Sequence, residues 1–250
     1  MSPKSIFNFI PYFIAFIVKM SSFSIPFRLR HRLNSFFSIP LFARAHPNGL
    51  DLAHDLSEQG IKPQTIFDVG ANVGQSAYQY HARWPKAEIY CFEPVQETFT
   101  QLIENVGSYA HCVQRACSAE KGTETIYVHP DDSGKSSLHK THGREEKIKK
   151  ITLDGFAREH EIEKIDLLKV DVEGHELGVL KGGINLIKDS AVKSIYIEVG
   201  FSESYYVPLN DIASVLKSQG FHLVSLHDQW TNPQTGKLQH ANALWVQSTE

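Results

Sequence analysis

The stretch from Thr65 to Gly74 constrains the fold of this chain more than any other, because it joins a strand-forming run to a glycine loop: Thr-Ile-Phe-Asp-Val-Gly-Ala-Asn-Val-Gly. The β-branched and aromatic first half is typical of a buried strand. Glycine lets the backbone approach a ligand closely, and a helix that begins near Gly74 would point its free N–H groups at the same place. The pattern predicts a ligand site in an α/β protein.

Two acidic residues accompany this loop. Asp68 lies near the carboxyl end of the first predicted strand, and Glu93 follows a second predicted strand at 88–92, roughly 20 residues past the glycines. Glu93 is thus placed to accept hydrogen bonds from both hydroxyls of a ribose. The spacing Gly70-x-x-x-Gly74 differs from the dinucleotide-binding Gly-x-Gly-x-x-Gly, and a carboxylate beside it suits a cationic amino-acid group better than a pyrophosphate. These residues favour S-adenosylmethionine over NAD, unless they only form a tight strand-to-helix turn.

A second polar group follows the near-continuous apolar run 165–172, which is typical of a buried parallel strand. Asp171, Glu173 and His175 lie at its end, before a predicted helix at 176–188. This strand is expected beside the first, so its carboxylates should face the same crevice. His175 and Glu173 compete for the role of the base that takes a proton from a hydroxyl. The alternative is that these residues are the acids and cap that a helix N-terminus favours.

Two further candidates lie at the ends of other predicted strands. Ser118 follows a predicted strand at 111–116, where a polar side chain would lie beside the adenine or would only form a turn. Glu198 lies near the carboxyl end of a predicted strand at 192–199. A third acidic strand end on the same edge is a candidate contact for substrate or for a metal.

A polar loop at 130–146 separates two alternating runs, 124–129 and 147–153, which we expect to be strands. The loop is long for a connector, and loops of this kind often form lids over a substrate. His139 and His142 are therefore candidate substrate residues. The alternative is a surface excursion with no role in binding.

The formal net charge of −3 for 250 residues hides an asymmetry. The first 50 residues contain six Lys or Arg and no Asp or Glu, which leaves the other 200 residues at −9. This negative body disfavours nucleic acid as a partner. The three cysteines form no CxxC pair, which favours a reducing compartment and a cytoplasmic location.

Residues 1–49 are predicted to be a basic and hydrophobic extension of a domain at 50–250. The apolar run 6–18 is broken by Pro11 and is shorter than the roughly 20 residues that a bilayer span needs. Arginines that alternate with aromatic and leucine side chains are typical of a segment on a membrane surface. Residues 1–45 are therefore expected either to contact the inner face of a membrane peripherally, or to pack on the domain or form a homo-oligomer contact.

Several motifs together resemble those of FkbM-type S-adenosylmethionine-dependent methyltransferases. They are Phe67-Asp68-Val-Gly-Ala-Asn-Val-Gly74, Phe92-Glu93-Pro94, Thr152-Leu153-Asp154, Leu168-Lys169-Val-Asp171-Val-Glu173-Gly174-His-Glu176-Leu, Val179-Leu180-Lys-Gly182 and Ile197-Glu198. The resemblance covers about residues 60–248. It implies the α/β fold of class I methyltransferases: a Rossmann-like, seven-stranded, mostly parallel sheet with the last strand antiparallel and helices on both faces.

The resemblance also implies roles for single residues. Asp171 and Glu173 would lie where cofactor and substrate meet. Members of this family commonly methylate oxygen on sugars, glycolipids or polyketides, which implies O-methylation of a hydroxyl on a small-molecule or glycan acceptor. Together with Ser118, the predicted cofactor-binding residues are Asp68, Gly70, Asn72, Gly74, Glu93 and Asp171.

Two functions from other classes stay open at this point. One is a nicotinamide-dependent oxidoreductase on a similar sheet, which the loop spacing and Asp68 disfavour. The other is a non-catalytic, membrane-associated nucleotide-binding module, which would not need the acidic strand ends. No metal is predicted, although Asp154, Asp171 and Glu198 would form a divalent metal site if they converged.

Overall fold

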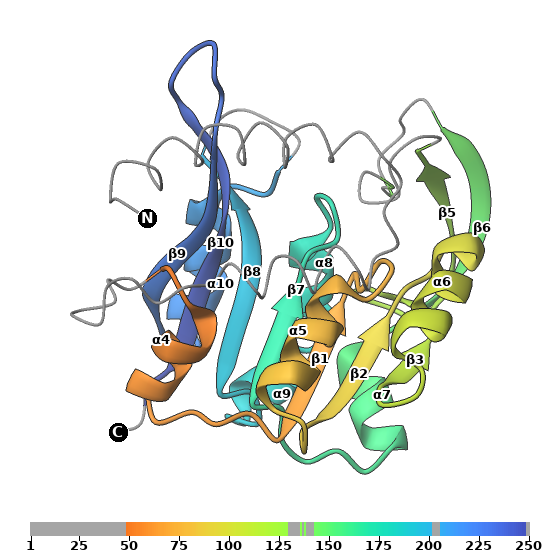
Figure 1. Ribbon diagram of the computed structural model, residues 1–250, viewed down its shortest axis with the longest axis horizontal. Helices are drawn as coiled ribbons and strands as arrows, with labels where there is room; N and C mark the ends of the chain where they lie inside the picture. The colour runs from red at the N-terminus through yellow and green to blue at the C-terminus, as the bar shows by residue number, and fades with distance from the viewer. Residues whose placement is uncertain (1–48, 130–135, 137, 139–142, 202–205, 249–250) are drawn as a thin grey trace, which may run out of the picture. The chain divides into compact units, whose positions relative to one another are not determined.

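The computed structural model describes residues 49–129, 136, 138, 143–201 and 206–248 (Figure 1). The predicted N-terminal extension lies outside this range, except for its last residue, as do the substrate candidates His139 and His142. Within the described part, no helix has the length and apolar character needed to span a lipid bilayer.

A seven-stranded sheet forms the centre of the domain. Its order is β3-β2-β1-β7-β8-β10-β9, and β10 runs antiparallel to both of its neighbours while the other pairs are parallel. This arrangement confirms the predicted class I methyltransferase fold, including the antiparallel last strand. The strands are β1 (Thr65–Val69), β2 (Glu88–Phe92), β3 (His111–Val113), β7 (Leu167–Val170), β8 (Ser194–Gly200), β9 (Phe221–Thr231) and β10 (Leu238–Gln247).

Alternate strand residues point to opposite sides of the sheet, and both sides carry apolar side chains. Helices therefore cover both faces. Ile66 of β1 belongs to a buried cluster with α4, α5 and α6, whereas the next residue, Phe67, packs with α7, α8, α9 and α10. Figure 1 shows α4, α5 and α6 on the near face. The helices are α4 (Leu52–Glu58), α5 (Gln75–Arg83), α6 (Gln96–Val106), α7 (Leu153–Glu159), α8 (Glu176–Gly182), α9 (Ile184–Lys188) and α10 (Leu209–Lys217).

A second sheet of three strands lies between β3 and α7 in the chain. It contains β4 (Ala116–Cys117), β5 (Gly122–Val128) and β6 (Arg144–Ile151) in the order β4-β6-β5. The antiparallel pairing of β5 and β6 confirms the two predicted alternating strands. Apolar side chains of these strands form a separate cluster with Val95, which follows β2. The second sheet therefore packs against the carboxyl end of β2.

Three predicted elements need correction. The expected strand at 111–116 is two strands in two sheets, because β2 ends at Phe92 and leaves no partner beyond Val113. The expected helix at 176–188 is divided into α8 and α9 at Gly183, since adjacent glycines weaken a helix. The run 147–153 ends earlier as a strand, and α7 follows it unpredicted. Thr152 caps α7 by accepting a hydrogen bond from the Gly155 N–H.

Candidate active site

A cavity of about 300 Å³ opens at the carboxyl ends of β1, β2 and β7. Pockets for small ligands typically have volumes of about 300–1,000 Å³. The second sheet contributes one wall of this cavity. Of the residues predicted from the sequence, Asp68, Gly74, Ser118 and Glu198 lie outside the lining. Those that line it are Gly70, Asn72, Glu93, Asp171, Glu173 and His175.

Glu93 is held rigidly at the end of β2. Its Oε1 accepts a hydrogen bond from the Val95 N–H at 2.9 Å, and its Oε2 accepts one from the Asn72 N–H at 3.1 Å. The residue is only 7% exposed, and burial raises the pKa of its carboxyl group to about 7 against the pull of these two N–H groups. The carboxyl group thus has a fixed position in the cavity wall, with further acceptor capacity for a ligand.

The loop after β1 needs glycine at position 70. Gly70 has a φ of +76°, and an added Cβ would lie 1.8 Å from the backbone oxygen of Asp171. The Gly70 and Ala71 N–H groups both donate to the carbonyl of Phe92, which ties the loop to β2. Gly74 has a different structural role: because it lacks a side chain, the start of α5 can pack against Val106 of α6. Only the first of the two glycines shapes the cavity directly.

Asp68 does not face the cavity, contrary to the prediction that it presents a carboxylate to the ligand. It has no exposed surface, and its Oδ1 lies 3.2 Å from Nζ of Lys169. The same Nζ lies 3.4 Å from Oδ2 of Asp171 and donates to the Gly70 carbonyl at 2.9 Å. Burial disfavours the charge on Lys169, but the two carboxylates outweigh this and raise its pKa. Lys169, which lines the cavity, therefore pairs with the carboxylates of both Asp68 and Asp171.

Three carboxylates gather at the ends of β7 and β8. Oxygen atoms of Asp171, Glu173 and Glu198 all lie within 4.8 Å of one another. Burial, and then the negative charges of Asp171, Glu173 and Glu176, raise the pKa of Glu198 to about 9. Carboxylate oxygens are the ligands that Mg²⁺ and Ca²⁺ prefer, so these three residues could hold a divalent cation.

One of the three candidate metal ligands considered from the sequence is wrong. Asp154 does not join Asp171 and Glu198, because its carboxylate accepts hydrogen bonds from the backbone N–H groups of Asn185 and Leu186. It therefore fixes the start of α9 against α7. Glu173 takes its place in the group.

His175 reaches the cavity wall from the N-terminus of α8, as predicted, but its ring is engaged. Its Nε2 lies 2.9 Å from Oγ of Ser118, and the ring packs where a side chain on Gly178 would be. Ser118 itself follows β4 rather than the third strand of the main sheet, and it lies outside the cavity lining. Its hydroxyl instead links the second sheet to α8.

An apolar wall faces these polar residues, and the sequence reasoning missed it. Val95, Ile126, Leu138 and Ile148 line the cavity from the β2 end and the second sheet. A flat apolar group such as an adenine would be buried by such a wall. The alternation of Ile126 and Ile148 with polar neighbours indicated strands with one buried face, but not that this face borders a ligand site. Lys169 likewise belongs to a family motif, but the sequence alone predicted no role for it.

Comparisons with known proteins agree on one family. The model described as the methyltransferase FkbM domain matches residues 68–223. The hexuronic acid methyltransferase AglP of Haloferax volcanii is 32% identical over 154 residues, which cover 60% of this chain but only 61% of that protein. The 2-O-methyltransferase NoeI of Sinorhizobium fredii is 30% identical over 183 residues, covering 64% of this chain and 73% of that protein.

Among solved structures, magnesium protoporphyrin IX methyltransferase from Synechocystis PCC 6803 with bound S-adenosylmethionine aligns with a TM-score of 0.48 and 12% identity. That alignment covers 78% of this chain and 76% of the other. The family match spans more than half of the sequence, including the end of β1 and all of β2, β7 and β8. The prediction from the sequence motifs is thus confirmed, and the chain belongs to the FkbM family of methyltransferases.

Proposed function

We propose that this chain transfers the methyl group of S-adenosylmethionine to a hydroxyl oxygen of a sugar or of a sugar-containing precursor. The observation that carries the proposal is the position of Glu93, a buried carboxyl group in the cavity wall at the end of β2. Its remaining acceptor capacity suits the paired hydroxyls of a ribose.

The residues present fit the rest of the cofactor. The apolar wall formed by Val95, Ile126 and Ile148 suits the adenine. Gly70 also lines the cavity, and Asp171 offers a carboxylate to the ammonium group of the methionine part. Because Asp68 is buried outside the cavity lining, Asp171 takes the role that was first expected for Asp68.

In methyl transfer to oxygen, the main role of the protein is to position the reacting groups. When bound, S-adenosylmethionine would supply a methyl carbon that its sulfonium already activates. The chain must hold the acceptor hydroxyl in line and remove its proton. Glu173 lines the cavity, and its carboxylate lies beside those of Asp171 and Glu198. We therefore place the general base at Glu173 and give His175, which is bound to Ser118, a positioning role.

The names of the relatives support both the reacting atom and the acceptor class. NoeI is named for methylation at oxygen, and AglP for methylation of a hexuronic acid. If the acceptor needs a divalent cation, Asp171, Glu173 and Glu198 are the residues that would hold it.

The test is calorimetric titration of the full chain with S-adenosylhomocysteine and, separately, with NADH. We expect saturable binding of the first compound alone. Glu93→Ala should weaken it by roughly tenfold to a hundredfold, the effect of losing a charge-assisted hydrogen bond. Glu97→Ala, which removes an exposed carboxylate on the first turn of α6, is the matched control and should bind normally. Binding of NADH alone, or equal affinity of both variants, would contradict the proposal.

A further inference from the structure

An aromatic shelf lies beside the three carboxylates. We use this name for Tyr206, Trp230 and His240. The His240 ring stacks on that of Tyr206 with centroids 4.4 Å apart, and on that of Trp230 with centroids 5.6 Å apart. Trp230 is nonetheless 46% exposed. A large aromatic face is thus held in place by its neighbours but remains open to a ligand.

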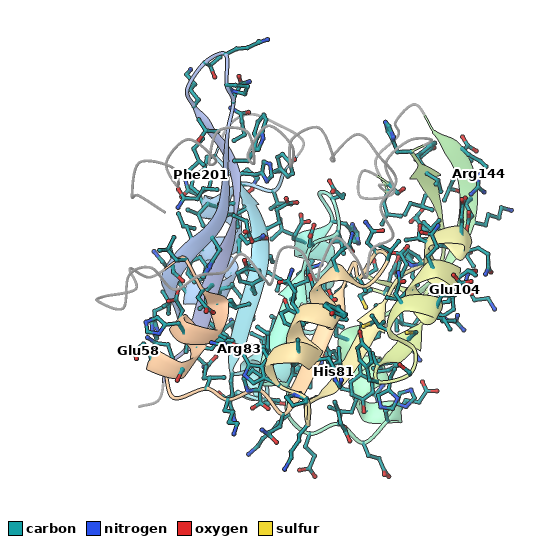
Figure 2. All side chains as sticks on the ribbon, viewed as in Figure 1. Glu58, His81, Arg83, Glu104, Arg144 and Phe201 are labelled. Carbon is teal, nitrogen blue, oxygen red and sulfur yellow. The ribbon has the colours of Figure 1, made fainter. Side chains whose placement is uncertain are left out.

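The antiparallel direction of β10 brings this shelf to the cavity edge. His240, near the start of β10, pairs with Gly200 at the carboxyl end of β8 and with Trp230 on β9. The β9–β10 pairing is irregular on both sides of His240, and such bulges re-aim side chains. Figure 1 shows the β9–β10 hairpin extending beyond the ends of β7 and β8, and Figure 2 labels Phe201, 37% exposed, beside it.

A chain of contacts connects the shelf to the cavity. Nδ1 of His240 lies 3.2 Å from Oε1 of Glu198. Glu198 in turn lies in the carboxylate group with Asp171 and Glu173, both of which line the cavity. Glu198 therefore connects the shelf to the carboxylates of the cavity wall.

We propose that the shelf and Glu198 form the acceptor subsite, and that it takes a sugar ring without negative charge. The C–H face of a pyranose packs on an aromatic ring such as that of Trp230, while carboxylate and imidazole groups accept and donate hydrogen bonds to ring hydroxyls. The inference rests on the proposed methyl transfer and refines its substrate class. A uronic acid would meet Asp171 and Glu173 with a charge of the same sign. The acceptor class thus differs from the one named for AglP.

The test measures binding of two probes, methyl glucoside and methyl glucuronide, by saturation-transfer NMR to the full chain saturated with S-adenosylhomocysteine. We expect methyl glucoside to bind, and methyl glucuronide to bind about tenfold more weakly or not at all. Trp230→Ala and Trp230→Leu should each weaken the glucoside by about tenfold, since the second variant keeps an apolar side chain but removes the aromatic face. Leu223→Ala is the control, because Leu223 is a 38% exposed residue on the same strand.

The affinity for S-adenosylhomocysteine distinguishes a failure of the acceptor subsite from a failure of the proposed function. If the wild type binds it and Trp230→Ala binds methyl glucoside as well as Leu223→Ala does, the acceptor subsite is wrong while the proposed function stands. The proposed acceptor subsite would also be wrong if the chain preferred methyl glucuronide or bound neither glycoside. Failure of the wild type to bind S-adenosylhomocysteine would instead contradict the proposed function.

Discussion

Nζ of Lys169 lies 3.2 Å from Oδ1 of Asp68, a carboxylate with no exposed surface. We predict that Lys169→Met lowers the free energy of unfolding by about 3–5 kcal/mol, because it leaves a buried charge without its partner. Chemical denaturation measures the change. The double variant Asp68→Asn/Lys169→Met should recover part of the loss. Arg83→Met is the control: that arginine pairs with Asp51 at the surface and should cost no more than about 1 kcal/mol. An equal cost for both single variants would contradict the assigned role of the buried pair.

Gly70 and Gly60 have similar backbone conformations, with φ of +76° and +69°, but different surroundings. A Cβ at Gly60 would meet nothing within 4 Å, whereas one at Gly70 would meet the Asp171 carbonyl. Gly60→Ala should therefore cost only the strain of a left-handed conformation, about 1–2 kcal/mol. Gly70→Ala should cost several kcal/mol more or prevent folding. Thermal denaturation of both variants checks this, and similar melting temperatures would show that the loop yields more easily than its contacts suggest.

Glu93 gives the stability of the ligand-free protein a pH dependence with a definite sign. Its folded pKa of about 7 exceeds the ordinary value of 4.5, so the folded protein holds a proton that the unfolded chain has already released. The free energy of unfolding should consequently fall as pH rises from about 4.5 to 7, by up to about 3 kcal/mol from this group. Denaturation curves for wild type and Glu93→Gln across this window isolate the contribution. Parallel pH profiles of the two proteins would show that the carboxyl group titrates normally.

Glu173 and His175 can be separated by kinetics. If Glu173 takes the hydroxyl proton, Glu173→Gln should lower kcat by roughly 10²–10⁴ while cofactor affinity changes little. His175→Gln should have a smaller effect on kcat, since the Nε2 of His175 is bound to the Ser118 hydroxyl. Initial rates at saturating S-adenosylmethionine provide the comparison. The reverse order of effects would return the base role to His175.

The sequence was sufficient to predict the elements whose signals are local. The run 65–69, its glycine loop and Glu93 lie as expected because strand propensity, turn chemistry and burial all favour the same arrangement. The antiparallel last strand followed from two strands joined without a helix. Prediction failed where the structure of a segment depends on the strand that pairs with it in the sheet. Nothing between His111 and Ala116 shows that β2 stops halfway along that run.

The chemistry of the site was harder to predict for the same reason. A carboxylate at 68 and a lysine at 169 are about a hundred positions apart, and only the pairing of β1 with β7 brings them together. The expectation that Asp68 faces the ligand treated its charge as unpaired. Asp154 was considered a metal ligand on its residue type alone, although its oxygens are occupied by the start of α9. The aromatic shelf could not be predicted without the register of β9 and β10, which the sequence does not show.

The reversed direction of β10 has a consequence for divergence within the family. The cofactor cavity is encoded by residues 69–175, whereas Trp230 and His240 lie near the tip of a hairpin that follows all of those residues in the chain. With the acceptor subsite that we propose, substitutions in that hairpin would alter which acceptor is taken while Glu93, Gly70 and the second sheet stay unchanged. Exchange of the hairpin between relatives offers a route to methyltransferases with new acceptors and an inherited cofactor site.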